Sequence, residues 1–191
     1  MSARAGMTHL IARLRAMTET AAGDYAVDGL SYWSDDQLQD ALDAQVGRID
    51  LRLIEPLPEA VAGRTEWHDY PLGAGDLEEP DSGAPYWSLT DSAGQEVPTE
   101  GYTLDALSGV VRFPVDQAGA IYFVKARAYD LARAAAVVWR MKMAHAASLY
   151  DFRAEDQQFS RGQWFDHCRQ MAELYTRQSA PRFVALRRED L

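Results

Sequence analysis

The chain has 191 residues, of which 47% are hydrophobic and 25% charged, and this fits one globular domain with a real core. No apolar run reaches the roughly 18 residues that span a bilayer. Residues 1–7 also lack the apolar core of a signal peptide, so we expect a protein made in the cytoplasm. The formal net charge is −10, and residues 21–110 hold nineteen acidic residues against three arginines, which argues against this region gripping nucleic-acid phosphates.

Two helices are predicted in the N-terminal part of the chain. The first covers residues 7–18, because apolar residues recur there at helical spacing. A loop over residues 18–34 follows, and the second helix is predicted over residues 35–54. Its start is marked by Ser34 as the N-cap and by Gln37, which completes a capping box. Its predicted apolar face consists of Leu38, Leu42, Val46, Ile49 and Leu53.

Residues 60–124 change character, because the helical period is lost and turn residues multiply. We interpret this stretch as a small antiparallel β insertion. A hairpin is indicated where Ser108 and Gly109 separate two short apolar segments. Further predictions are an exposed acidic loop over residues 76–83, a turn over 91–94 and a strand over 121–124.

The C-terminal part is predicted to contain two long helices, over residues 126–149 and 161–177. Residues 134–139 are apolar nearly all round the first of these, so it must be covered on more than one side. It is either the central helix of the fold or packs on a neighbouring subunit. Ser160 and Gln163 have capping-box spacing before the last helix. Cys168, the only cysteine, is expected to be a small buried hydrophobe within it.

The predicted fold class is therefore α+β and mainly α: a bundle of about four helices with the β insertion between the second and third. One domain is expected over residues 1–178. The extended tail over residues 179–191 is too short for a core of its own. It is either a disordered end or a docking segment for a partner.

The sequence carries no recognised catalytic or cofactor motif. It has no nucleophile elbow, no phosphate-binding loop and no dinucleotide fingerprint. The four histidines are scattered without metal-ligand helical spacing. We therefore expect no enzyme, no cofactor and no metal. A carboxylate pair for acid–base chemistry stays open within the acidic middle, as does a small acidic enzyme or regulator of unknown substrate.

Five short segments, taken in order and spacing, resemble the head–tail adaptor (connector or head-completion) proteins of tailed bacteriophages. They are residues 101–105, 108–114, 127–131, 150–152 and 158–163. The resemblance implies a structural virion protein made in the host cytoplasm and located in the neck. Such proteins form a ring under the portal, typically of twelve copies, which extends the DNA channel and offers a platform for the tail or a stopper protein. Double-stranded DNA would pass without specific binding.

The resemblance also assigns roles to particular residues. The tail becomes a portal-docking segment, whose anchors and charge partners are Pro181, Arg182, Phe183, Val184, Leu186, Arg187 and Arg188. Packing between subunits is expected at Val138, Trp139, Tyr150, Phe152, Phe159 and Trp164. The acidic middle is either an ordinary solvated surface or a wall that faces passing DNA. The alternative within the same context is a tail-terminator or another neck protein that contacts the tail tube.

Overall fold

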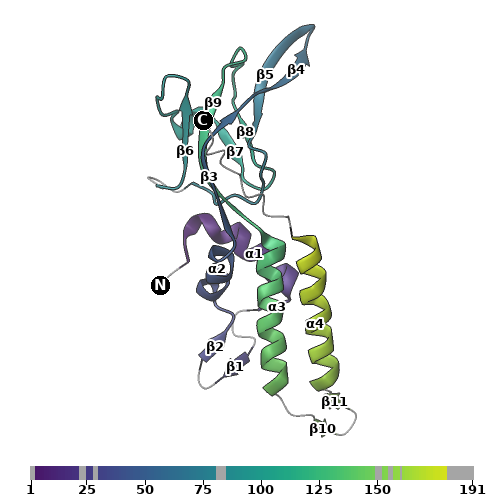
Figure 1. Cartoon of the computed structure of the whole chain (residues 1–191). Helices are drawn as coiled ribbons and strands as arrows, with labels where there is room; N and C mark the ends of the chain where they lie inside the picture. The colour runs from purple at the N-terminus through teal and green to yellow at the C-terminus, as the bar shows by residue number, and fades with distance from the viewer. Residues whose placement is uncertain are drawn as a thin grey trace, which may run out of the picture.

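The computed structural model describes residues 3–21, 25–27, 30–80, 85–148, 152–154, 157–159 and 161–179. Helices gather at one end of the molecule and the larger sheets at the other (Figure 1). The helical half contains α1 (Thr8–Thr18), α2 (Asp35–Asp43), α3 (Leu131–Ser148) and α4 (Arg161–Gln178). A 3₁₀ turn over Ala5–Met7 leads into α1, and none of the described helices is long and apolar enough to cross a membrane.

The β half consists of two antiparallel sheets with a shared core. The first has the strand order β3-β9-β6, and the second has the order β4-β5-β8-β7. Their bounds are β3 Val46–Ile54, β4 Leu57–Val61, β5 Arg64–Pro71, β6 Ser88–Asp91, β7 Thr103–Asp105, β8 Val110–Arg112 and β9 Tyr122–Tyr129. Between the sheets, the rings of Tyr70, Phe113 and Tyr122 lie within 5.3 Å of one another, centroid to centroid. This aromatic cluster makes the β half a folded body with its own core.

Two short hairpins and a turn complete the described elements. β1 (Tyr25–Val27) pairs with β2 (Leu30–Tyr32), and β10 (Phe152–Ala154) pairs with β11 (Gln157–Phe159). A 3₁₀ turn covers Thr99–Gly101. The first hairpin falls within the loop that the sequence predicted over residues 18–34.

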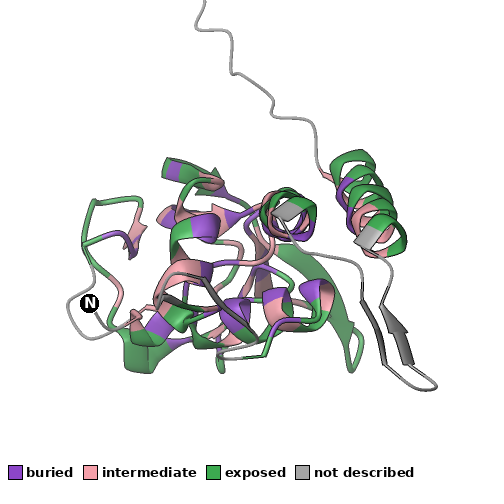
Figure 2. Cartoon of the chain, turned by 90° about the horizontal axis from the view of Figure 1, so that it is seen from below, coloured by how far each residue is buried: buried purple, intermediate pink, exposed green. Residues whose placement is uncertain are grey.

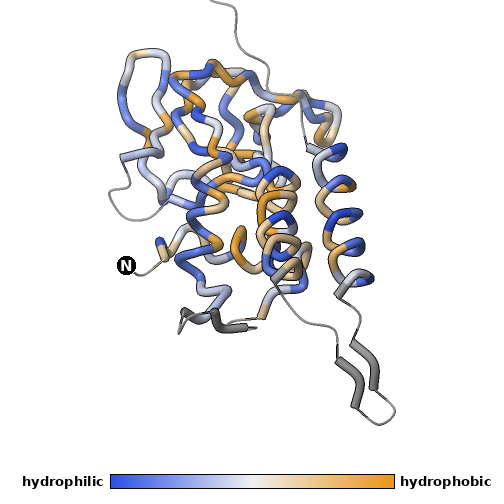
Figure 3. Tube along the Cα trace, turned by 60° about the horizontal axis from the view of Figure 1, so that its bottom comes forward, coloured by the Kyte–Doolittle hydropathy of each residue, from blue (hydrophilic) through white to orange (hydrophobic). Residues whose placement is uncertain are grey.

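The helical half has a separate core in which α1 and α2 pack against α3. Leu10, Leu14, Leu38 and Val138 are completely buried there. α4 contributes through a smaller cluster, in which Cys168 and other residues of its inner face contact α3. Figure 2 shows α4 beside α3 at the edge of the molecule, with much of its surface exposed. Hydrophilic and hydrophobic positions alternate along α4, as expected for a helix covered on one side (Figure 3).

The predicted mainly helical bundle is wrong. The chain forms two antiparallel sheets with a core of their own, so the β part is no small insertion. The β half reaches from residue 46 to residue 129, beyond both predicted limits of 60 and 124. The sheets' shared core involves residues far apart in sequence, and this is information that local periodicity does not contain.

Two predicted helices were too long for the same reason. The predicted helix over 35–54 ends at Asp43, and β3 occupies residues 46–54. Its supposed apolar row continued because Ile49 and Leu53 happen to follow Leu42 at helical spacing. Similarly, residues 126–129 complete β9, and α3 begins only at Leu131.

Several local predictions are confirmed. The Ser34 hydroxyl accepts a hydrogen bond from the Gln37 backbone, and the Gln37 side chain accepts one from the Ser34 backbone. α1 and α4 match the predicted helices over 7–18 and 161–177 within a residue. β7 and β8 form the predicted hairpin, with Gly109 at a positive φ of 69°. Cys168 is buried, and burial raises the pKa of its thiol. The proposed N-cap Ser160 lies outside the described residues.

Candidate assembly interface

The β4–β5 hairpin projects from the β half as an arm (Figure 1). We define the β arm as residues 55–66. Its tip is a two-residue turn in which Ala62 and Gly63 both have positive φ, 48° and 81°. Such a turn matches the right-handed twist of antiparallel strands, and glycine adopts the second position without strain. All five residues of β4 are exposed, so one copy of the chain leaves this strand uncovered.

An exposed apolar edge runs from β3 into the arm. Leu51 is 65% exposed, Leu53 44%, Leu57 54% and Val61 36%. We call these four residues the exposed edge. β3 and β4 are the outermost strands of their respective sheets. Single exposed apolar residues are ordinary, but four along successive edge strands indicate a surface that associates with something.

The backbone of this edge is poorly suited to open-ended strand addition. The pairing of β3 with β9 shifts between Ile49 and Arg52, and Leu51 has a positive φ of 44°. Pro58 removes one backbone donor from β4. Bulges and edge prolines are devices by which proteins prevent uncontrolled sheet extension. Contacts at this edge therefore depend on side chains more than on added strands.

Ion pairs fix the base of the arm. Nε and Nη2 of Arg112 on β8 donate to the two carboxylate oxygens of Asp69 on β5, each at 2.6 Å. These hydrogen bonds lower the pKa of Asp69. One residue earlier in β5, His68 places Nε2 3.0 Å from the Glu66 carboxylate and Nδ1 3.1 Å from the Phe113 carbonyl oxygen. The contact with Glu66 raises the pKa of His68. These contacts join β5 at the base of the arm to β8 and to Phe113, which follows it.

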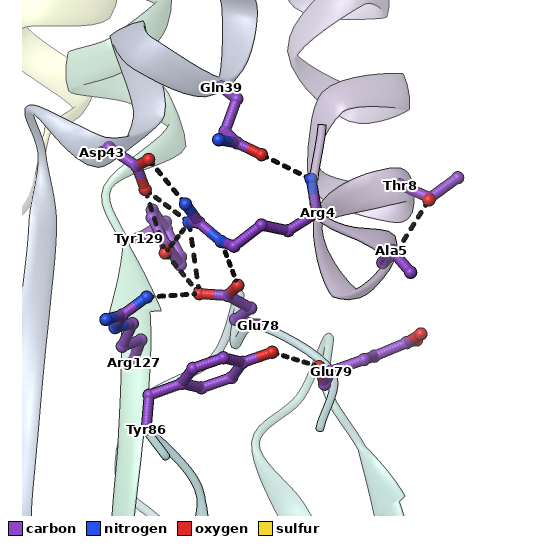
Figure 4. A network of polar contacts seen from close by, with 10 residues as sticks. All are labelled: Arg4, Ala5, Thr8, Gln39, Asp43, Glu78, Glu79, Tyr86, Arg127 and Tyr129. Atoms are coloured by element: carbon purple, nitrogen blue, oxygen red, sulfur yellow. Dashed lines mark hydrogen bonds and ion pairs between the residues drawn. The ribbon is translucent and has the colours of Figure 1, made fainter. Parts of the chain in front are cut away.

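A buried polar network joins the β half to the helical half (Figure 4). Glu78 is completely buried and accepts hydrogen bonds from Arg4 Nε at 2.6 Å and from the Tyr129 hydroxyl at 2.7 Å. Arg4 also donates to both oxygens of Asp43 on α2, at 2.9 and 2.6 Å, and these bonds raise its pKa. Arg127 supplies a second cation to Glu78 at 3.4 Å. Burial raises the pKa of the Tyr129 hydroxyl, which therefore stays protonated as a donor.

The prediction of an exposed acidic loop over residues 76–83 is wrong at its centre, because Glu78 is completely buried. Leu77 bridges to Ala128, so this segment runs along the end of β9. The backbone N–H of Glu79 donates to the Gly6 carbonyl oxygen. A Cβ on Gly6 would lie 2.1 Å from the Glu79 carbonyl oxygen, so the N-terminal turn requires a glycine there.

The residues predicted to pack between subunits do not form one surface in the structure. Val138 and Trp139 are completely buried by this chain's own helices, and they leave no surface for a neighbour. Trp164 is half-buried and contacts Trp139 edge-on. Phe152 and Phe159 lie opposite each other in the β10–β11 hairpin. Tyr150 lies outside the described residues.

The predicted portal-docking residues also lie outside the described residues. These are Pro181, Arg182, Phe183, Val184, Leu186, Arg187 and Arg188. Sequence reasoning missed the β arm, although Ala62 and Gly63 between alternating residues offered a hairpin signal. It also missed the role of Arg4, whose partners lie 39 and 74 residues away and leave no local signal.

Within the described part of the chain, no group of three or more histidine, cysteine, aspartate or glutamate side chains is placed to hold a metal ion. A comparison with models of known protein families finds none that matches this chain, and a comparison with curated proteins finds no significant match.

Proposed function

We propose that this protein is a structural head–tail adaptor of a tailed bacteriophage, and that it works by assembling into a ring beneath the portal. The observation that carries this proposal is the exposed edge, which runs from β3 into the projecting β arm. A structural protein needs complementary surfaces that copies can share, and the exposed edge is such a surface. The sequence resemblance over residues 101–163 supplies the phage context.

The distribution of charge supports a role beside DNA without binding to it. Residues 21–110 hold nineteen of the 29 acidic residues of the chain against three arginines, and DNA binding requires cationic neutralisation of phosphates. In the proposed ring, acidic surface along the channel would let double-stranded DNA pass without holding it. The proposed location is the neck of the virion, and the proposed partners are the portal, further copies of this chain, and a tail or stopper protein.

The proposal is tested by mixing the full chain with purified portal protein and examining the complex by negative-stain microscopy. We expect a ring of added density beneath the portal. The double variant Leu57→Ser and Val61→Ser should weaken assembly by at least about tenfold, because it removes apolar contact area from the arm. Leu107→Ser is the matched control, since Leu107 is 55% exposed but lies outside the exposed edge. A chain that never associates with portal would contradict the proposal.

A truncation after Gln178 tests the docking role of residues 179–191 separately. We expect the shortened chain to lose portal binding and to keep the stability of the full chain. Normal portal binding by the truncated chain would show that the tail is no docking segment. If the full chain instead captured a tail-tube protein and ignored portal, the tail-terminator alternative would replace the adaptor.

A further inference from the structure

A groove of about 620 Å³ lies where the β half meets the helical half. The start of β3, the end of β9, the first turn of α3 and the last residue of α4 line it. Small residues form a large part of its lining, including Gly47, Gly73, Ala74 and Ala128. Backbone is therefore accessible along the groove, and an extended segment or a narrow hairpin can approach closely.

Three arginines give this groove a positive character. Arg48, Arg52 and Arg133 all line it. Arg52 donates to the Leu72 carbonyl oxygen at 3.0 Å, whereas the side chains of Arg48 and Arg133 form no hydrogen bond or ion pair with another described residue.

The two acidic residues of the lining have local roles. Asp76 pairs with Arg13, and the Asp130 side chain accepts a hydrogen bond from the backbone of Arg133. Two guanidinium groups in the groove are thus available to an acidic partner.

The β arm has the complementary chemistry. It carries three glutamates, Glu55, Glu59 and Glu66, against the single cation Arg64. Glu55 and Glu59 are exposed, and Leu57 and Val61 supply apolar surface on the same strand. Alternating apolar and acidic groups on a narrow hairpin match a groove that combines small apolar residues with arginines.

The arm of one chain does not reach its own groove. β3 leads away from Arg48 toward the arm and is paired with β9 from Val46 to Ile54, with a register shift between Ile49 and Arg52. The tip at Val61 is thirteen residues beyond Arg48, which corresponds to a span of up to about 40 Å along extended strands. The groove's complementary arm must therefore come from another molecule.

We infer that the β arm of one copy docks into the arginine-lined groove of the next copy. This inference rests on the proposed function and names the contact that builds its ring. The two surfaces differ, so the contact is head-to-tail, and repetition by rotation closes a ring. The bulge at Leu51 and Pro58 oppose indefinite strand addition, which favours closed docking over fibres.

Charge reversal tests the inference on the full chain in solution. Glu59→Arg on the arm and Arg133→Glu in the groove should each weaken self-association at least about tenfold, as measured by sedimentation velocity. A chain that carries both changes should recover to within about threefold of the original, because the reversed charges attract again. Glu100→Arg is the control, an exposed glutamate outside the arm. Absence of recovery would overturn the inference, as would a chain that stays monomeric up to about 1 mM.

Mixing the two single variants gives an independent test. In a head-to-tail contact, the Arg133→Glu chain keeps an intact arm and the Glu59→Arg chain keeps an intact groove. The mixture should therefore form heterodimers that native mass spectrometry detects, at concentrations where each variant alone, weakened at least about tenfold, stays mainly monomeric. In a symmetric arm-to-arm contact, the Arg133→Glu chain keeps both contacting surfaces and self-associates as strongly as the original chain, and that result would overturn the inference.

The chain's own residues 179–191 are the competing occupant, because Gln178 lines the groove. Truncation after Gln178 should leave self-association unchanged. If the truncated chain no longer self-associated, the groove would be assigned to residues 179–191 and the inference would be overturned. Failure of this inference is distinct from failure of the adaptor function. Rings on portal without charge-swap recovery would refute only the arm–groove contact, whereas recovery without portal binding would refute only the adaptor role.

Discussion

The two halves of this molecule are stabilised in different ways. In the β half, both sheets share one core rich in aromatic rings, and the arm extends beyond it. In the helical half, α1, α2 and α3 form the main core, while α4 is attached to α3 through a small separate cluster. Each half thus has a peripheral part that is supported from one side. The arm is acidic and apolar, and α4 is an ordinary amphipathic helix, so the arm is the better candidate for assembly.

The largest effect is expected where α4 meets the rest of the helical half. Trp139 is completely buried, contacts Trp164 and donates from Nε1 to the Met17 carbonyl oxygen. Trp139→Ala should lower the free energy of unfolding by about 4 kcal/mol, since it leaves a large cavity. Urea denaturation measures this. Met141→Ala, at an exposed position of the same helix, is the control and should change it by less than about 0.5 kcal/mol. Equal losses of stability in Trp139→Ala and Met141→Ala would show that the contact of Trp139 with Trp164 does not hold α4 in place.

The next largest loss of stability is expected at the junction between the two halves. Glu78→Ala removes a buried carboxylate and leaves Arg4 and Arg127 without it. We expect a loss of about 3 kcal/mol in the free energy of unfolding, because Arg127 loses its carboxylate, the Tyr129 hydroxyl loses an acceptor and Arg4 keeps only Asp43. The exposed neighbour makes a matched control, and Glu79→Ala should be nearly neutral. If both variants were equally stable, the network would not hold the two halves together.

A smaller effect is expected at the start of α2. Ser34→Ala removes the capping hydrogen bond to the Gln37 backbone and should cost about 1 kcal/mol. Ser34→Asp, which retains a capping acceptor, should restore most of the loss. The comparison of the two variants by thermal or urea unfolding separates the cap from a general effect of substitution. Identical losses in both would contradict the capping role.

The smallest expected effect is a change in the pKa of His68, at the base of the arm. Glu66 raises the pKa of His68 above its ordinary value of 6.5. The contact therefore stabilises the folded chain fully below pH 6.5, and this contribution disappears as the pH rises through the folded-state pKa. NMR titration of His68 should give a pKa above 6.5 in the original chain and a lower one in Glu66→Gln. An unchanged pKa in the variant would contradict the assignment of the cause.

The sequence predicted the features that depend on neighbouring residues. The cap at Ser34, the hairpin at Gly109 and the helix that contains Cys168 each have a local chemical signal. Long-range pairing was the part that sequence reasoning missed. Ile49 continued a helical period but pairs with Ala126 in a sheet, and Glu78 appeared solvent-exposed because Arg4 is 74 residues away.

The candidate site was predicted less well than the fold. Val138 and Trp139 were expected between subunits, but the apolar character of their helix buries them inside one copy. The exposed edge was overlooked because Leu53 was placed in a helix, where it extended an apolar face. An apolar residue is buried or exposed according to the sheet to which it belongs, and sheet membership is set by tertiary structure.

The most direct test of the central claim is native mass spectrometry of the full chain mixed with portal protein. We expect complexes with many copies of this chain on each portal ring, and a strong loss of these copies in the Leu57→Ser and Val61→Ser double variant. The Leu107→Ser control should retain them. Complexes that form equally well with the double variant, or a chain that remains single in the presence of portal, would contradict assembly through the arm.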